Sequence, residues 1–204
     1  MNDELQFLQL VRLRGRSTAV DLAASTGLST EIAATAARGL CDAGLLQDVR
    51  GRLKITGEGR AELTALIAAE RQEVDREQIS AAYDEFSSIN TTFKQLVTDW
   101  QLVGDEKPND HADADYDAAV ISRLGDIHNE FRPLLRRLVE LAPRLQMYPE
   151  RFDSALAKIL GGDHSWLARP LVDSYHTAWF ELHEDLIGLA GLTRAEEAAA
   201  GRAQ

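Results

Sequence analysis

The sequence has a single cysteine and no long apolar run. Cys41 has no second cysteine with which to form a disulfide within the chain, and this is typical of a protein in a reducing compartment. The apolar stretches are short and interrupted by polar residues, so we expect no membrane-spanning segment and no membrane partner. Residues 1–4 show no basic start followed by an apolar segment, and no secretion signal is expected. Together these absences predict a cytoplasmic protein.

The chain also lacks the short motifs that accompany common enzymatic chemistries. It has no Gly-x-Ser-x-Gly motif of a nucleophilic serine, no glycine-rich phosphate loop and no paired cysteines. We therefore expect no enzymatic activity, no cofactor and no metal site.

The first 72 residues contain few aromatic residues and carry no net charge. Phe7 is the only one of 13 aromatic residues there, and nine basic residues balance nine acidic ones. Residues 73–204 contain all five histidines, together with 13 basic and 24 acidic residues, which account for the whole net charge of −11. This contrast predicts two domains, 1–72 and 73–204. Because an acidic surface repels phosphate, any DNA contact belongs to the first.

Residues 17–60 have the pattern of two short helices followed by a hairpin. After a glycine turn at Gly27, a helix over Thr30–Ala43 is expected to begin at a Ser/Thr cap. Its inward-facing stripe is predicted to be Ile32, Ala36 and Leu40. Apolar pairs then flank a polar tip around Gly51, which indicates a hairpin. With a leading helix over Glu4–Arg14, this order predicts a winged helix-turn-helix.

The same stretch resembles the winged-helix domain of MarR-type bacterial transcription regulators. The resemblance rests on Leu40-x-x-Ala43-Gly44-Leu45-Leu46, the wing glycine Gly51, and Leu53-x-Ile55-Thr56-x-x-Gly59-Arg60. It covers about the first third of the chain. It implies that the second helix enters the DNA major groove and that the wing contacts the neighbouring backbone or minor groove.

The candidate DNA contacts lie on that second helix and on the wing. Arginine can bind guanine through two hydrogen bonds, serine and threonine can meet bases or phosphates, and wing cations can neutralise phosphates. The predicted set is Ser29, Thr30, Thr35, Arg38, Arg50, Arg52 and Lys54. The carboxylate of Glu31, near the helix start, would repel phosphate. An alternative therefore stays open, in which the winged helix binds protein instead of DNA.

The second domain is predicted to be an all-helical bundle with no strand after residue 60. The charged stretch up to residue 103 predicts one long helix or two helices with a hinge. Further helices are expected over Tyr116–Ala142, capped by Asp115, over Pro149–Leu160, and from Pro170 to about Ala190. The fold class is therefore mainly α, a winged helix-turn-helix with a small hairpin wing followed by an all-α bundle.

Parts of this domain resemble a helical region of uncharacterised actinobacterial proteins, to which no activity is assigned. The matching segments begin at Phe86-x-x-Ile89-Asn90, at Asn109-Asp110-His111 and at Ser174-Tyr175-His176. The layout of a winged helix followed by a helical bundle also resembles regulators of the FadR type, but their order of metal ligands is not reproduced.

Aromatic and histidine side chains share the predicted inner faces of the bundle. Rings interleaved with polar groups are typical of a pocket for a small organic effector. The candidate lining is Phe93, Trp100, His128, Tyr175, His176, Trp179 and His183. Packing within the core is the other open interpretation. A metal is less favoured because His176 and His183 lie about 10 Å apart along a helix. The acids at 113, 115 and 117 are interpreted as helix-capping residues rather than a calcium loop.

These features predict a transcription regulator that binds double-stranded DNA as a dimer. Its bundle is expected to bind a small effector, to form the dimer contacts, or to do both. The alternative is an accessory protein whose winged helix binds protein and whose bundle docks on a metabolic enzyme.

Overall fold

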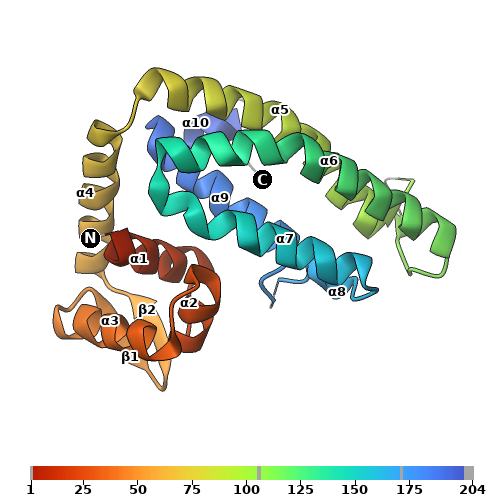
Figure 1. Cartoon of the computed structure of the whole chain (residues 1–204). Helices are drawn as coiled ribbons and strands as arrows, with labels where there is room; N and C mark the ends of the chain where they lie inside the picture. The colour runs from red at the N-terminus through yellow and green to blue at the C-terminus, as the bar shows by residue number, and fades with distance from the viewer. Residues whose placement is uncertain (1, 105–106, 171, 200–204) are drawn as a thin grey trace. The chain divides into compact units, whose positions relative to one another are not determined.

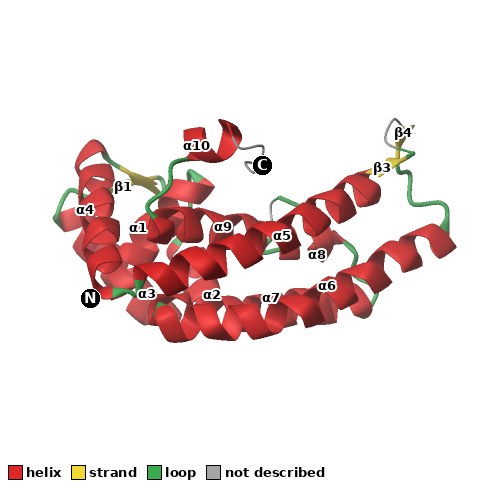
Figure 2. Cartoon of the chain, turned by 90° about the horizontal axis from the view of Figure 1, so that it is seen from above, coloured by secondary structure: helices red, strands yellow, loops and turns green. Residues whose placement is uncertain are grey.

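The computed structural model describes residues 2–104, 107–170 and 172–199 and is mainly helical, which confirms the predicted mainly α character (Figure 1). Among these residues, strands form only short hairpins (Figure 2). The chain divides into two compact units, Met1–Val74 and Asp75–Gln204. The predicted division lay two residues earlier. Among the described residues, no helix combines the length and the apolar character needed to cross a membrane.

The first unit consists of four helices and one hairpin. In chain order they are α1 (Asn2–Arg14), α2 (Ala19–Thr26), α3 (Thr30–Asp42), β1 (Leu46–Val49), β2 (Arg52–Ile55) and α4 (Gly57–Glu73). The antiparallel hairpin pairs Leu46 with Ile55 and Val49 with Arg52, and a bridge from Ser17 to Leu53 extends it by one residue. Helices and hairpin therefore follow one another in the predicted order.

Hydroxyl side chains fix the helix starts in this unit. Thr18 forms a capping box with Asp21 at α2, Ser29 Oγ accepts a hydrogen bond from the Ile32 amide at α3, and Thr56 Oγ1 accepts one from the Gly59 amide at α4. Gly59 also permits a close approach, since a Cβ atom there would lie 2.0 Å from the carbonyl oxygen of Leu45. The hairpin can thus pack directly against the start of α4.

The stripe predicted for α3 is wrong at Ile32, and Ala36 is only half-buried. The buried residues of this helix are Ala33, Ala37 and Leu40, whereas Ile32 is 53% exposed. Two small alanines let α3 pack closely on its neighbours, and this turns the helix by about one residue relative to the stripe expected from the larger side chains. Ile32 consequently lies at the edge of the solvent-facing side.

The second unit is a helical bundle. Its elements are α5 (Arg76–Gln101), β3 (Leu102–Val103), β4 (Lys107–Pro108), α6 (Ala114–Leu141), the 3₁₀ turn η1 (Pro143–Gln146), α7 (Met147–Leu160), α8 (Ser165–Ala168), α9 (Tyr175–Ala190) and α10 (Arg194–Ala199). The long helices α5 and α6 pack side by side, and α9 contacts both α5 and α7. The interior of this bundle holds most of the aromatic residues of the chain.

Three predicted details of this unit are wrong. Leu102 and Val103 pair with Pro108 and Lys107 as a two-residue hairpin, too short to show an alternating pattern. Asp113, not Asp115, caps α6, because its carboxylate accepts hydrogen bonds from the amides of residues 115 and 116. The last large helix begins at Tyr175 rather than Pro170, since Ser174 Oγ accepts from the Thr177 amide.

The charged connector follows the second of its two predicted alternatives. Helix α4 ends at Glu73, Val74 has an extended backbone, and Asp75 caps α5 through hydrogen bonds from the amides of Glu77 and Gln78. A break of two residues therefore separates α4 from α5.

Candidate nucleic-acid interface

Helix α3 presents a polar side to solvent. Thr30, Thr35 and Arg38 are exposed, and Arg38 Nη2 donates a hydrogen bond of 3.0 Å to Thr35 Oγ1. This bond directs the guanidinium back along the helix toward its first turn. Ser29 is exposed as well, but its hydroxyl is used to cap the helix. Thr35 and Arg38 thus form one hydrogen-bonding pair on the outer side of α3.

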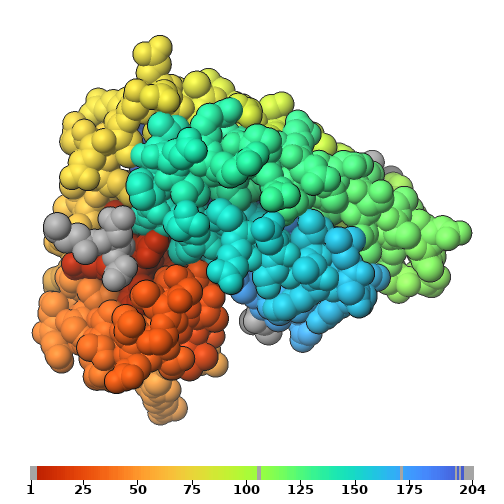
Figure 3. All heavy atoms as spheres, viewed as in Figure 1, coloured from red at the N-terminus to blue at the C-terminus, as the bar shows by residue number. Residues whose placement is uncertain are grey.

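The hairpin carries its cations at and beside the tip. Arg50 and Gly51 form the two-residue turn with φ of 57° and 79°, the combination found in tight hairpin turns of type I′. Asp48 Oδ1 accepts a 2.7 Å hydrogen bond from the Gly51 amide and so stabilises the turn. Figure 3 shows this tip, in light orange, projecting from the rest of the first unit.

Alternation along β2 separates apolar from charged side chains. Leu53 and Ile55 are buried, while Arg52 and Lys54 are exposed, as is Arg50 at the turn. Within the described part of the chain, none of these three cations forms an ion pair. Among the described residues the tip therefore presents three cations without ion-pair partners, beside the single carboxylate of Asp48.

The outer side of α3 is not cationic. Glu31 and Asp42 are exposed on the same helix as Arg38. An anionic partner would meet one favourable and two unfavourable charges on α3, and its attraction must come mainly from the hairpin tip. The lone Cys41 lies on this helix too. Burial raises the pKa of its thiol, and the carboxylates of Asp48 and Asp42 raise it further, so the thiol is protonated at neutral pH.

The residues predicted to line an effector pocket lie mostly inside the bundle, packed against one another. The ring centroids of Phe93 and Trp179 are 4.3 Å apart, and those of Phe93 and Tyr175 are 5.6 Å apart. His176 is half-buried beside Phe93. Trp100 lies apart from this cluster, where its ring contacts His111 and His164.

The polar atoms in this cluster have protein partners. Trp179 Nε1 donates to Asn90 Oδ1 at 2.8 Å, and His183 Nε2 lies 3.2 Å from the Tyr83 hydroxyl. His128 contacts the Tyr175 hydroxyl through Nδ1 and Asp153 through Nε2. This arrangement matches the packing interpretation and gives no support to an effector pocket at these residues.

Two surface hollows on the described residues lie elsewhere. One of about 310 Å³ lies between α1 and α3, lined by Phe7 and the small side of α3. The other, of about 570 Å³, lies beside the loop from Val103 to Tyr116. The described residues contain no group of three or more histidine, cysteine or acidic side chains placed to hold a metal ion.

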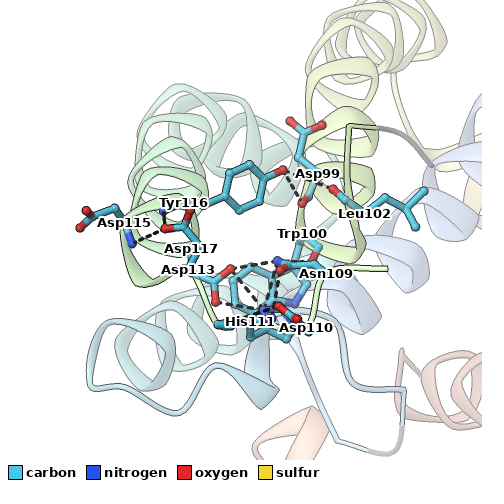
Figure 4. A network of polar contacts seen from close by, with 11 residues as sticks. Asp99, Trp100, Leu102, Asn109, Asp110, His111, Asp113, Asp115, Tyr116 and Asp117 are labelled. Atoms are coloured by element: carbon cyan, nitrogen blue, oxygen red, sulfur yellow. Dashed lines mark hydrogen bonds and ion pairs between the residues drawn. The ribbon is translucent and has the colours of Figure 1, made fainter. Parts of the chain in front are cut away.

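The acid-rich loop before α6 is held by a compact polar network (Figure 4). The buried carboxylate of Asp117 accepts hydrogen bonds from Asn109 Nδ2 at 2.9 Å and is 3.0 Å from His111 Nδ1. Asn109 also donates to the carbonyl of Trp100, and Tyr116 donates its hydroxyl proton to the carbonyl of Asp99. These bonds join the loop to the end of α5 and give the carboxylate of Asp117 structural partners.

Sequence reasoning missed a set of buried charges around α9. Arg151 pairs with Glu181 and with Asp173, while Arg144 lies 3.0 Å from Asp185. Burial alone would lower the pKa of Arg151, but the facing carboxylates of Glu181 and Asp173 raise it overall. Burial also raises the pKa of Tyr148, whose hydroxyl donates to Asp185 at 2.6 Å. The available signal was the run of acids on the otherwise apolar last large helix.

No protein-family model, curated protein or solved structure matches this chain.

Proposed function

We propose that the protein is a dimeric DNA-binding transcription regulator whose first unit contacts the duplex through α3 and the β1–β2 hairpin. The observation that carries the proposal is the hairpin tip, where Arg50, Arg52 and Lys54 are exposed and form no ion pair within the described part of the chain. The exposed Thr35–Arg38 pair on α3 supplies hydrogen-bond donors and acceptors for base edges.

The small number of cations argues for two copies on one duplex. With Arg38 assigned to base edges, the three hairpin cations could neutralise about three phosphates per monomer, and affinity rises with that number. A symmetric pair doubles it, and two-fold symmetric operators are the common targets of helix-turn-helix dimers. The bundle supplies the dimer contacts in this proposal.

A second function, binding of a protein through the same surface, is favoured by a specific set of side chains. Besides Glu31 and Asp42, the first unit exposes Val20 on α2 by 60% and Val49 on the hairpin by 44%. Acids and exposed aliphatic groups suit a protein surface better than a phosphate backbone.

DNA binding of the full chain decides between the two. The native protein would first select duplexes from a random pool at low salt, and fluorescence anisotropy would then give the dissociation constant over a range of salt concentrations. The variant Arg50→Ala/Arg52→Ala/Lys54→Ala should bind more weakly, with a log–log salt slope lower by about 0.9 for each phosphate that the variant no longer neutralises.

The matched control removes three exposed arginines from the second unit, Arg132→Ala/Arg136→Ala/Arg169→Ala. This variant should retain the native affinity and slope. If the hairpin variant does the same, the tip has no role in DNA binding. If the native protein selects no duplex even at low salt, the regulator proposal is wrong and the protein-binding function is favoured.

A further inference from the structure

The inward packing of Ala33 and Ala37 leaves the Ile32 side chain exposed to solvent. The structure describes every residue of α3, and Ile32 is the only large apolar side chain that this helix exposes. It lies in the first turn, three residues after the Ser29 cap. Helices that read the major groove contact base edges mainly through residues near their N-termini. If α3 enters the groove, Ile32 is therefore among the side chains that reach the bases.

The neighbours of Ile32 leave it accessible. Thr35 and Gly39 follow at intervals of three and seven residues, which places all three along one side of the helix. Thr35 is short, and a Cβ atom built on Gly39 would meet no other atom within 4 Å. This side of α3 is thus a low surface from which the Ile32 side chain stands out.

An aliphatic side chain can discriminate only one base in the major groove. Thymine alone presents a methyl group there, at C5, whereas the other base edges present hydrogen-bonding groups that an isoleucine cannot satisfy. Packing Ile32 on that methyl group removes apolar surface of both partners from water.

We propose that Ile32 is a specificity-determining residue that packs against the C5-methyl group of a thymine in the operator. This inference rests on the proposed function, because it requires that α3 enters the major groove. The hydrogen-bonding pair Thr35–Arg38, on the adjoining part of the exposed side, would read the neighbouring base pair.

The test removes the methyl group from the DNA and the side chain from the protein, separately and together. Duplexes selected by the native full chain would be synthesised with deoxyuridine in place of one thymidine at a time, which deletes only the C5-methyl group. At one position in each half-site, this change should weaken native binding about fourfold, the factor expected for one buried methyl group.

The variant Ile32→Ala should bind the unmodified duplex more weakly and should show no further loss with deoxyuridine at that position, since the two changes remove the same interaction. Val20→Ala is the control, because Val20 is also exposed but lies on α2. It should keep the full sensitivity to deoxyuridine.

Each result separates the inference from the proposed function. Native binding that is unaffected by deoxyuridine at every position, or an equal sensitivity in native protein and Ile32→Ala, would overturn the role of Ile32 while leaving DNA binding in place. Failure of the native protein to select any duplex would overturn both.

Discussion

At the scale of single residues, Gly39 is a costly choice for the interior of a helix. Glycine in a helix interior is about 1 kcal/mol less favourable than alanine, and the structure has room for a Cβ atom at this position. No contact within the first unit therefore requires the glycine. A surface that approaches the α3 backbone from outside would require it.

We predict that Gly39→Ala stabilises the protein and weakens its DNA binding. The free energy of unfolding in urea should rise by about 0.5–1 kcal/mol, while anisotropy should show a higher dissociation constant for the selected duplex. Gly125→Ala is the matched control, since Gly125 also lies inside a helix with no atom within 4 Å of its Cβ position. Gly125→Ala should stabilise the protein equally without affecting DNA binding. If Gly39→Ala binds DNA with unchanged affinity, the DNA does not approach the α3 backbone closely at this position.

His183 makes the stability of the protein depend on pH. Burial lowers its pKa to about 4, although the carboxylates of Glu184 and Glu197 act in the opposite direction. Between pH 6.5 and about 4 the unfolded chain binds a proton at this histidine and the folded chain does not. Its contribution to stability is therefore complete above pH 6.5 and is lost as the pH falls toward 4, by about 3 kcal/mol at most.

We predict that His183→Gln reduces this dependence, because glutamine can still meet the Tyr83 hydroxyl but does not titrate. The measurement is the urea unfolding free energy of native and variant protein at pH 7.5 and at pH 4.5, and the quantity of interest is the difference between the two pH responses. Replacing the exposed His164 by glutamine should leave the native response intact. An identical response in His183→Gln and the native protein would contradict the prediction.

At the scale of elements, a buried ion pair joins α9 to α7. Glu181 is almost fully buried, and Arg151 on α7 is its cationic partner. Removal of one member of a buried pair leaves the other charge without compensation in a low-dielectric interior. An exposed pair loses little, because water solvates the remaining charge.

Two substitutions of the same kind should therefore differ strongly. Arg151→Met should lower the unfolding free energy by about 3–5 kcal/mol, whereas Arg137→Met, which removes the exposed pair between Arg137 and Glu85, should lower it by no more than about 1 kcal/mol. Urea denaturation at pH 7.5 gives both values. Equal losses in the two variants would show that the α7–α9 contact does not depend on its charges.

At the scale of the whole molecule, the proposed function requires two copies of the chain. The first unit offers only four of its cations, Arg38 and the three on the hairpin, to the proposed DNA interface, which is few for tight binding to a duplex. The acidic second unit adds no attraction for phosphate. We predict a dimer at tens of micromolar, measured by light scattering, and protection of two DNA half-sites about one helical turn apart in a footprint. A monomer with intact DNA binding would contradict this prediction.

Local signals in the sequence predicted much of the first unit. Ser29 and Gly27 mark a helix start and a turn through their own backbone preferences, and Gly51 marks the hairpin tip. Such signals act over three or four residues, so they can be read without knowledge of the fold. The separation of polar from apolar residues along β2 likewise follows from its alternation.

Errors arose where a choice between neighbouring residues depends on distant contacts. Asp113 and Asp115 are equally good caps in isolation, and the network that joins Asp117 to Asn109 and His111 fixes the loop so that Asp113 takes this role. Ile32 is the stronger apolar residue, yet the close packing of Ala33 and Ala37 decides which side of α3 faces inward.

The sequence by itself determined the mainly helical class, the order of helices and hairpin in the first unit, and the positions of the cations on the hairpin, because these follow from periodicity and turn chemistry. Only the tertiary structure decided that the aromatic and histidine side chains of the second unit fill its interior against one another. The sequence pattern of aromatic residues at helical spacing is the same whether the rings line a cavity or pack against one another. The difference depends on how α5, α6, α7 and α9 approach, and that approach is set by contacts between residues such as Asn90 and Trp179, 89 positions apart in the chain.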